Sequence, residues 1–267
     1  MSVLLQVSDA HFGAEIPAVR DALRELALQE RPDVVVWTGD LTQRARRDQF
    51  AAARAFADSL PGAQTVAMPG NHDIPLYNVV ERLLRPYAGY RQAFGPELEP
   101  ELEREDLLLL LVKTTRRWRH ERGELSPAQV ERVAQRLRRA SPRQLRVVAT
   151  HQPLHAADAG DRAHRLRGPA DTLAVWAEAG MDLLLGGHTH RPRCDRVDAG
   201  ARAVWVVQAG TSISHRVRGG LPNSVNLLRH DTSADAGASH CSVEQWDFDE
   251  ERGTFVQARC TQALLTR

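Results

Sequence analysis

The sequence predicts an α/β fold in which buried strands alternate with amphipathic helices. Short, continuously apolar runs recur along the first two thirds of the chain, and segments with apolar residues at helical spacing separate them. Strands that are apolar throughout are buried on both faces, as in sheets built from βαβ units. The early strands also end in polar side chains, and ligands of open α/β sheets bind at the carboxyl ends of strands.

The first half of the chain holds three expected strands and two expected helices. The strands span residues 3–7, 34–37 and 64–68. The helices span residues 16–30 and about 44–59, because apolar residues recur there every three or four positions. This alternation predicts parallel strands that are connected by helices.

The same alternation continues into the middle of the chain. Further strands are expected at residues 107–112, 145–149 and 183–185. Helices are expected at residues 127–139 and 170–179. Ser126 as N-cap and Pro127 at the first helical position give the first of these helices a well-marked start.

Two charged segments interrupt the pattern. Residues 95–106 are acidic and contain prolines, so we expect a solvated loop. Residues 116–122, RRWRHER, form a basic loop with one tryptophan. This loop is either a solvated surface or a wall that faces an anion near the site, since arginine binds phosphate well.

Beyond residue 191 the expected strands follow one another without helices. They span residues 203–207, 224–228 and 241–248, and we expect them to be mostly antiparallel and to complete a second sheet. The chain shows no linker-like break, internal repeat or low-complexity segment. We therefore expect one domain over residues 1–267.

Composition and charge argue against several classes of function. The net charge of +1 gives no global attraction to nucleic acid, and no basic track for a long backbone is evident, which argues against a nuclease. The three cysteines form no CxxC pair, which suits a reducing compartment. Without a signal peptide or an apolar stretch of ~20 residues, we expect a cytoplasmic protein with no membrane span. Both a monomer and a homodimer are compatible with this composition.

Polar side chains follow five of the expected strands. They are Asp9 and His11, Asp40, Asn71 with His72 and Asp73, His151, and His188 with His190. Each has an ordinary explanation as a turn, cap or core residue, but recurrence at five strand ends predicts a shared site. If the backbone stays extended after the strand at residues 183–185, His188 and His190 point to the same side. Carboxylate, amide and imidazole ligands suit two transition metals ~3.5–4 Å apart that share a carboxylate.

These blocks resemble the signature of the calcineurin-like metallophosphoesterases. The sequence reads DxH at residues 9–11, GD at 39–40, GNHD at 70–73, a lone His151, and GHTH at 187–190, in the family's order. The resemblance implies a four-layer αββα sandwich, with two mixed sheets flanked by helices and a dinuclear metal centre at the strand ends. The family commonly uses manganese, iron or zinc.

The resemblance also implies a division of roles. Seven residues would bind the metals: Asp9, His11 and His190 the first, Asn71, His151 and His188 the second, and Asp40 both. His72 would donate to the substrate phosphate or protonate the leaving group, held in place by Asp73. The metals would neutralise the phosphoryl oxygens and acidify a water, so that the phosphoester hydrolyses near pH 7.

The expected substrates are small phosphodiesters, because the chain most resembles bacterial class III cyclic nucleotide phosphodiesterases. Related UDP-diacylglucosamine pyrophosphatases carry arginine where this chain has His72. The alternatives are a broad-specificity phosphomonoesterase, a nucleotide pyrophosphatase or a scaffold without catalysis. A monoester dianion needs more positive charge than a diester does, unless Arg116, Arg117 and Arg119 fold over the metals.

Overall fold

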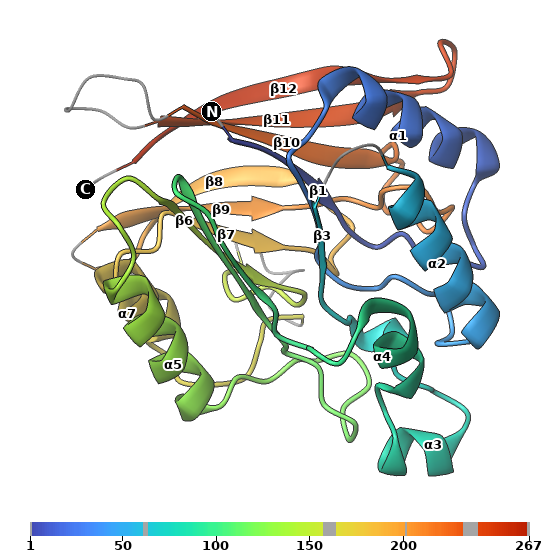
Figure 1. The fold of residues 1–267 in the computed structure, drawn as a ribbon, viewed down its shortest axis with the longest axis horizontal. Coiled ribbons are helices and arrows are strands. Elements are labelled where there is room, and N and C mark those ends of the chain that lie inside the picture. Colours follow the sequence, from blue (N-terminus) through green and yellow to red (C-terminus); the bar gives the residue numbers. More distant parts are fainter. Residues whose placement is uncertain (1, 61–63, 157–163, 201, 232–239, 266–267) are drawn as a thin grey trace.

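The computed structural model describes residues 2–60, 64–156, 164–200, 202–231 and 240–265. These residues form two six-stranded sheets that pack face to face, with helices on both outer sides (Figure 1). The fold is the four-layer αββα sandwich that the family resemblance implied.

The first sheet has the strand order β12-β11-β10-β1-β2-β3. Its strands are β1 (Ser2–Val7), β2 (Val34–Trp37), β3 (Gln64–Ala67), β10 (Ser224–Asp231), β11 (His240–Asp249) and β12 (Thr254–Leu264). The first three strands are parallel to one another, and β10 runs antiparallel to β1. The prediction that the C-terminal strands complete the second sheet is therefore wrong for residues 224–264. Strand β10 pairs along β1 and places this hairpin array in the first sheet.

The second sheet has the strand order β4-β5-β6-β7-β9-β8. Its strands are β4 (Glu101–Glu103), β5 (Leu107–Val112), β6 (Leu145–Thr150), β7 (Leu183–Gly186), β8 (Arg193–Asp198) and β9 (Ala203–Gln208). The four central strands are parallel, and the two edge strands are antiparallel to their neighbours. Residues 95–106 are thus not a loop throughout, because β4 pairs with β5 and covers that edge.

Helices cover the two outer faces, although α3 buries no residue against either sheet. They are α1 (Pro17–Glu30), α2 (Arg47–Ser59), α3 (Val79–Leu84), α4 (Ala88–Phe94), α5 (Pro127–Arg138) and α7 (Thr172–Glu178). Helices α1 and α2 lie on the first sheet, and α5 and α7 lie on the second (Figure 1). The predicted start of α5 is confirmed, since the Ser126 hydroxyl accepts a hydrogen bond from the Gln129 backbone N–H at 3.2 Å.

Alternation along the central strands builds three apolar layers. In β2, Val34 and Val36 pack between the two sheets, whereas Val35 and Trp37 pack under α1 and α2. A strand that is apolar on both faces can bury both only between two layers, so the sequence of β2 requires cover on each side. Across the part of the chain that the structure describes, no helix has the length and apolarity needed to span a bilayer.

Candidate metal centre

The predicted site residues meet where strands of both sheets end. Gln6 of β1 donates a hydrogen bond from Nε2 to the carbonyl oxygen of Gly186 of β7 at 3.0 Å. This contact joins the two strand ends across the interface between the sheets. The loops after β1 and β7 therefore start side by side, and both carry predicted ligands.

One group of predicted ligands consists of Asp9, His11 and His190, all buried. Their ligand atoms lie within 4.8 Å of one another. Nε2 of His190 is 3.1 Å from Oδ1 of Asp9, and Nε2 of His11 is 3.8 Å from the same oxygen. Three donors at this spacing can coordinate a single ion.

A second group consists of Asp40, His151 and His188, also buried and with ligand atoms within 4.8 Å of one another. Nε2 of His151 is 3.2 Å from Oδ1 of Asp40 and 3.2 Å from Oδ1 of Asn71. The amide oxygen of Asn71 is therefore a fourth donor beside this group.

The Asp40 carboxylate lies between the two groups. Its Oδ1 faces His151, and its Oδ2 is 3.8 Å from Nε2 of His11. Oδ1 also accepts a hydrogen bond from the backbone N–H of His72 at 2.8 Å, which fixes the rotation of the carboxylate. One side chain thus offers an oxygen to each group.

Most of the predicted ligands sit in left-handed backbone. They have positive φ angles of 52° at Asp9, 46° at His11, 52° at Asp40, 70° at His188 and 59° at His190. Such a conformation costs about 1–2 kcal/mol for a residue with a side chain, so these loops are strained where the ligands cluster. The expectation of extended backbone at His188 and His190 is wrong. The left-handed turns send the two imidazoles to different groups.

Two glycines allow the loops to approach closely. A Cβ at Gly70 would lie 2.1 Å from the backbone nitrogen of Asp40, and a Cβ at Gly187 would lie 2.1 Å from Oγ of Ser8 and 2.7 Å from Oδ2 of Asp9. No side chain fits at either position without displacing a predicted ligand.

Backbone carbonyls orient two of the histidines. Nδ1 of His151 donates to the carbonyl of Thr38 at 2.8 Å, and Nδ1 of His190 donates to the carbonyl of Arg216 at 2.6 Å. In each ring this contact holds a proton on Nδ1, so Nε2 is the atom that faces the carboxylates. Metal-binding histidines are commonly held by such second contacts.

Four of the buried groups have protonation states that fit metal ligands, whereas the nearby Asp40 outweighs burial and raises the pKa of His151 to about 9, so a metal would displace a proton from that ring. Burial lowers the pKa of both His11 and His188 to about 3, so these imidazoles are neutral. Burial alone would raise the pKa of Asp9 and Asp40, but nearby histidines outweigh it and lower the pKa of both carboxyls. Neutral imidazoles and charged carboxylates are the forms that bind metal.

Unpartnered nitrogens test whether these residues fit a metal. Both ring nitrogens of His11 and Nε2 of His188 are buried without a hydrogen-bond partner among the described residues. Leaving such an atom unpaired costs about 1–3 kcal/mol, and a metal ion would satisfy it. The residues therefore fit a metal centre.

His72 stands at the edge of the cluster and is partly exposed. Its ring lies 4.7 Å from that of His11, centroid to centroid, and its Nδ1 donates to the carbonyl of Gln43 at 3.0 Å. Asp73 does not hold this ring, contrary to the prediction. Its carboxylate instead accepts backbone N–H groups of Leu41, Thr42 and Gly70 at 2.8–3.0 Å. Asp73 thus fixes the loops that carry Asp40 and His72.

Arg216 is a residue of this site that the sequence did not reveal. Its Nη1 donates to Nε2 of His72 at 3.2 Å and to Oε1 of Gln43 at 3.1 Å. No motif marks it, because it lies on a loop beyond the signature blocks. His164 was also missed, and its ring centroid is 5.2 Å from that of His188.

Arg116, Arg117 and Arg119, which could have added positive charge over the metals, have other partners. Arg116 donates to Oε1 of Gln129 at 2.7 Å, Arg119 pairs with Glu124 at 2.7 Å, and Arg117 donates to the carbonyl of Leu83 at 2.6 Å. In the described part of the chain, none of them contacts a predicted metal ligand. The cation beside His72 is Arg216.

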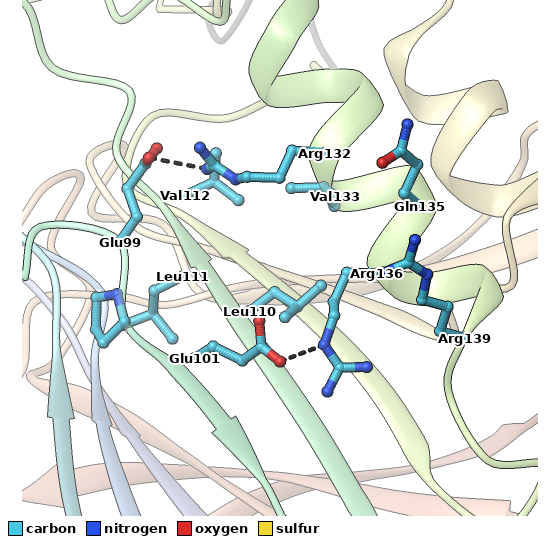
Figure 2. Close-up of a pocket in the computed structure, with 11 residues that line it drawn as sticks. Glu99, Glu101, Leu110, Leu111, Val112, Arg132, Val133, Gln135, Arg136 and Arg139 are labelled. Carbon is cyan, nitrogen blue, oxygen red and sulfur yellow. Dashed lines mark hydrogen bonds and ion pairs between the residues drawn. The ribbon is translucent and has the colours of Figure 1, made fainter.

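A separate pocket lies between α5 and the β4–β5 edge (Figure 2). Two of its three arginines face acids: Arg132 pairs with Glu99 at 2.8 Å, and Arg136 pairs with Glu101. It shares no lining residue with the metal centre. Because Arg132 and Arg136 are already neutralised, only Arg139 is left to attract an anion, and the pocket is a poor site for a phosphate.

Comparisons with known proteins agree with this geometry. Residues 2–192 match the family model for calcineurin-like phosphoesterases. The chain is 30% identical over 207 residues to the 3′,5′-cyclic adenosine monophosphate phosphodiesterase CpdA of Escherichia coli, covering 70% of this chain and 69% of that protein. It is 28% identical over 224 residues to a UDP-2,3-diacylglucosamine hydrolase of Ralstonia nicotianae, covering 75% and 81%.

Among solved structures, the purple acid phosphatase PPD1 of yellow lupin superposes with a TM-score of 0.71 at 13% identity. The alignment covers 98% of this chain but only 53% of the plant protein, so the chain spans about half of that relative and the likeness concerns the fold. The family model and the two relatives of similar sequence, by contrast, assign both the family and the class of enzyme. The chain belongs to the calcineurin-like phosphoesterase family and is a metal-dependent phosphoester hydrolase.

Proposed function

We propose that the protein hydrolyses small phosphodiesters, cyclic nucleotides among them, at a dinuclear metal centre. The observation that carries this proposal is the position of Asp40, whose two oxygens face two separate groups of ligands. Asp9, His11 and His190 would hold one metal. Asn71, His151 and His188 would hold the other, and Asp40 would bridge them. Manganese, iron and zinc all suit this mixture of imidazole and carboxylate.

Bound metals would neutralise the phosphoryl oxygens and supply a hydroxide nucleophile near pH 7. The chain's own residues arrange the rest. Asp9 and Asp40 offset part of the metal charge, so a diester monoanion matches the site better than a monoester dianion does. The carbonyls of Thr38 and Arg216 keep His151 and His190 in the tautomer that presents Nε2.

His72 is the proposed general acid. The Gln43 carbonyl holds its Nδ1–H, which leaves Nε2 to face the substrate. In the absence of substrate, Nε2 accepts a hydrogen bond from Arg216. An incoming phosphate offers Arg216 a charged acceptor instead. That exchange frees the Nε2 lone pair of His72 to take up a proton from solvent, which Nε2 then donates to the leaving-group oxygen.

The relatives support two substrate classes. CpdA is a cyclic adenosine monophosphate phosphodiesterase by name, which favours cyclic nucleotides. The second candidate is a nucleotide pyrophosphate, because Arg216 adds a cation beside the proposed general acid and because UDP-2,3-diacylglucosamine hydrolases are also relatives. A second phosphate in the leaving group would suit that cation.

A direct comparison of substrates tests the proposal. With manganese present, bis-p-nitrophenyl phosphate should be hydrolysed faster than p-nitrophenyl phosphate, and cyclic AMP faster than AMP. Faster hydrolysis of both monoesters would overturn the diester assignment. A nucleoside diphosphate sugar hydrolysed faster than either diester would favour the second candidate.

We also propose that residues 1–267 form one domain. Strand β10 pairs with β1 over five residues, from Ser2 to Gln6, so the C-terminal strands share a sheet with the N-terminal one. A chain truncated before β10 should then fail to give a cooperative thermal transition. A cooperative transition in that truncated chain would contradict the single domain.

A further inference from the structure

Exposed apolar side chains are concentrated in one place. Of the ten large apolar side chains exposed in the described structure, six lie on and around α3, each between 48% and 77% exposed. They are Tyr77, Val79, Val80, Leu83, Leu84 and Trp118. Helix α3 has four apolar residues in six and buries none of them. We call these six side chains the α3 patch.

The patch is held together by arginines. Arg117 donates from Nη1 to the carbonyl of Leu83 at 2.6 Å, and Arg82 donates from Nη2 to the carbonyl of Arg119 at 2.6 Å. These bonds join the helix to the loop that carries Trp118. The guanidinium of Arg44 lies 5.4 Å from the centre of the Tyr77 ring. The exposed side chains therefore stand on a fixed surface.

The surroundings of the patch are strongly basic. Residues 77–85 and 116–124 together contain six arginines and three glutamates, which gives a net charge of +3 with histidine neutral, and Glu124 pairs with Arg119. The whole chain carries only +1. Positive charge is thus collected at the segments that expose the most apolar surface.

We propose that the α3 patch docks the protein on an anionic lipid bilayer. Aliphatic side chains with tyrosine and tryptophan suit the boundary between headgroups and acyl chains, and arginines nearby attract anionic headgroups. In Figure 1, α3 lies at the lower edge of the molecule, beyond α4, with no other element below it. A protruding helix can meet a flat surface. A second copy packed on the patch would bring like charges together.

The docking surface is independent of the proposed catalytic residues, so both can be tested separately. Tyr77 is five residues from His72, and the segment between them runs from the metal centre to the patch. Docking would hold that edge of the metal centre toward the membrane. Docking on a bilayer does not depend on which phosphoester the site hydrolyses.

Vesicle sedimentation of the full-length protein tests this inference. Binding is expected to phosphatidylglycerol-containing vesicles and not to pure phosphatidylcholine vesicles. The double variant Val80→Ser/Leu84→Ser should bind at least about tenfold more weakly, because both side chains would lose apolar burial. Leu28→Ser is the matched control, since Leu28 is an exposed leucine of α1 outside the patch. Arg85→Glu should weaken binding, whereas Arg143→Glu should not.

Fluorescence gives an independent readout. Trp118 is 64% exposed, and the other four tryptophans are buried or partly buried. A blue shift on adding anionic vesicles should therefore disappear in Trp118→Phe. Circular dichroism and hydrolysis of bis-p-nitrophenyl phosphate without vesicles would check that each variant is folded.

Three results would overturn the inference. The first is no binding to anionic vesicles, and the second is equal binding by wild type and Val80→Ser/Leu84→Ser. The third is a dimer in sedimentation equilibrium that the double variant dissolves, in a protein that does not bind vesicles. That result would assign the patch to self-association.

Discussion

The two sheets contribute different chemistry to the metal centre. Loops of the first sheet supply both carboxylates, together with His11, Asn71 and His72. Loops of the second sheet supply only imidazoles, which are His151, His188 and His190. Negative charge thus comes from one side only, whereas imidazoles come from both sides. The groups around Asp9 and around His151 each need residues from both sheets, whereas His11, Asp40 and His72 come from the first sheet alone.

Loops of each sheet also form hydrogen bonds to predicted ligands from the other sheet. The backbone N–H of His188, from the second sheet, donates to Oδ2 of Asp9 at 3.0 Å. In return the carbonyl of Thr38, from the first sheet, accepts from Nδ1 of His151 at 2.8 Å. The ligands therefore reach their positions only when the sheets pack. Metal affinity and folding should accordingly be coupled in this protein.

The largest effect is expected from removing the shared carboxylate. Asp40→Asn keeps the shape of the side chain and tolerates left-handed backbone, but it removes the charge between the two groups. We expect at least about 10³-fold lower activity and fewer than two metals per chain. Asp58→Asn, at an exposed position, is the control. Full metal content in Asp40→Asn would rule out the bridging role.

A second-sheet ligand should be less critical for metal binding. His190→Ala removes a ligand of one group only, so one metal per chain should remain. Metal analysis of this variant beside Asp40→Asn compares the two sides directly. Equal loss of both metals in the two variants would remove the distinction between them.

His72 is expected to affect turnover without affecting metal content. His72→Ala should lose roughly 10²–10⁴-fold in turnover on substrates with poor leaving groups and keep both metals. The loss should shrink with p-nitrophenyl esters, whose leaving group needs little protonation. His72 lies close enough to His11 and Asp40 to be a ligand itself. Loss of metal in this variant would assign it that role.

Arg216 should have a smaller effect. Arg216→Ala removes a charged donor worth about 1.5–3 kcal/mol, which predicts a fall of roughly 10–100-fold in kcat/KM. The backbone carbonyl that holds His190 remains, so metal content should not change. Arg216→Lys should recover part of the activity. A larger loss on pyrophosphates than on diesters would favour the second candidate substrate.

The smallest expected effect is on the stability of the metal-free protein. Burial lowers the pKa of His151, but the nearby Asp40 outweighs it and raises the pKa to about 9. A raised pKa in the folded state stabilises the fold below the unfolded value near 6.5, and this stability is lost as pH rises through 9. The pKa of His190 is raised in the same direction, chiefly by Asp9 against the effect of burial. With chelator present, Tm should therefore fall between pH 6.5 and 9.

Manganese should abolish this fall, because metal replaces the protons on the histidines. A Tm that falls equally with and without manganese over this range would mean that His151 does not bind the ion.

Local patterns predicted much of the fold, because a continuous apolar run is enough to mark a buried strand. The pairing of β10 with β1 was not predicted, since an apolar strand fits either sheet and its partner lies at the far end of the chain. Helix α3 was also missed. It buries no residue, so it carries no apolar periodicity against a core.

The site was predicted only in part, because motifs identify ligands but not the contacts that depend on tertiary packing. Motif residues at strand ends were expected to converge, and the structure brings them together in three overlapping groups, one of which includes His72. Asp73 follows His72 directly, yet the short 3₁₀ turn at Asn71–Asp73 points its carboxylate to the backbone of Leu41 and Thr42. Arg216 reaches His72 from a distant loop. Contacts of this kind depend on tertiary packing, which no local pattern records.

Metal binding to the wild-type protein tests the central claim most directly. Manganese titration followed by electron paramagnetic resonance should give two ions per chain, with the spectrum of a magnetically coupled pair, as expected for ions that share the Asp40 carboxylate. One ion per chain, or two ions with uncoupled spectra, would contradict a dinuclear centre built on Asp40.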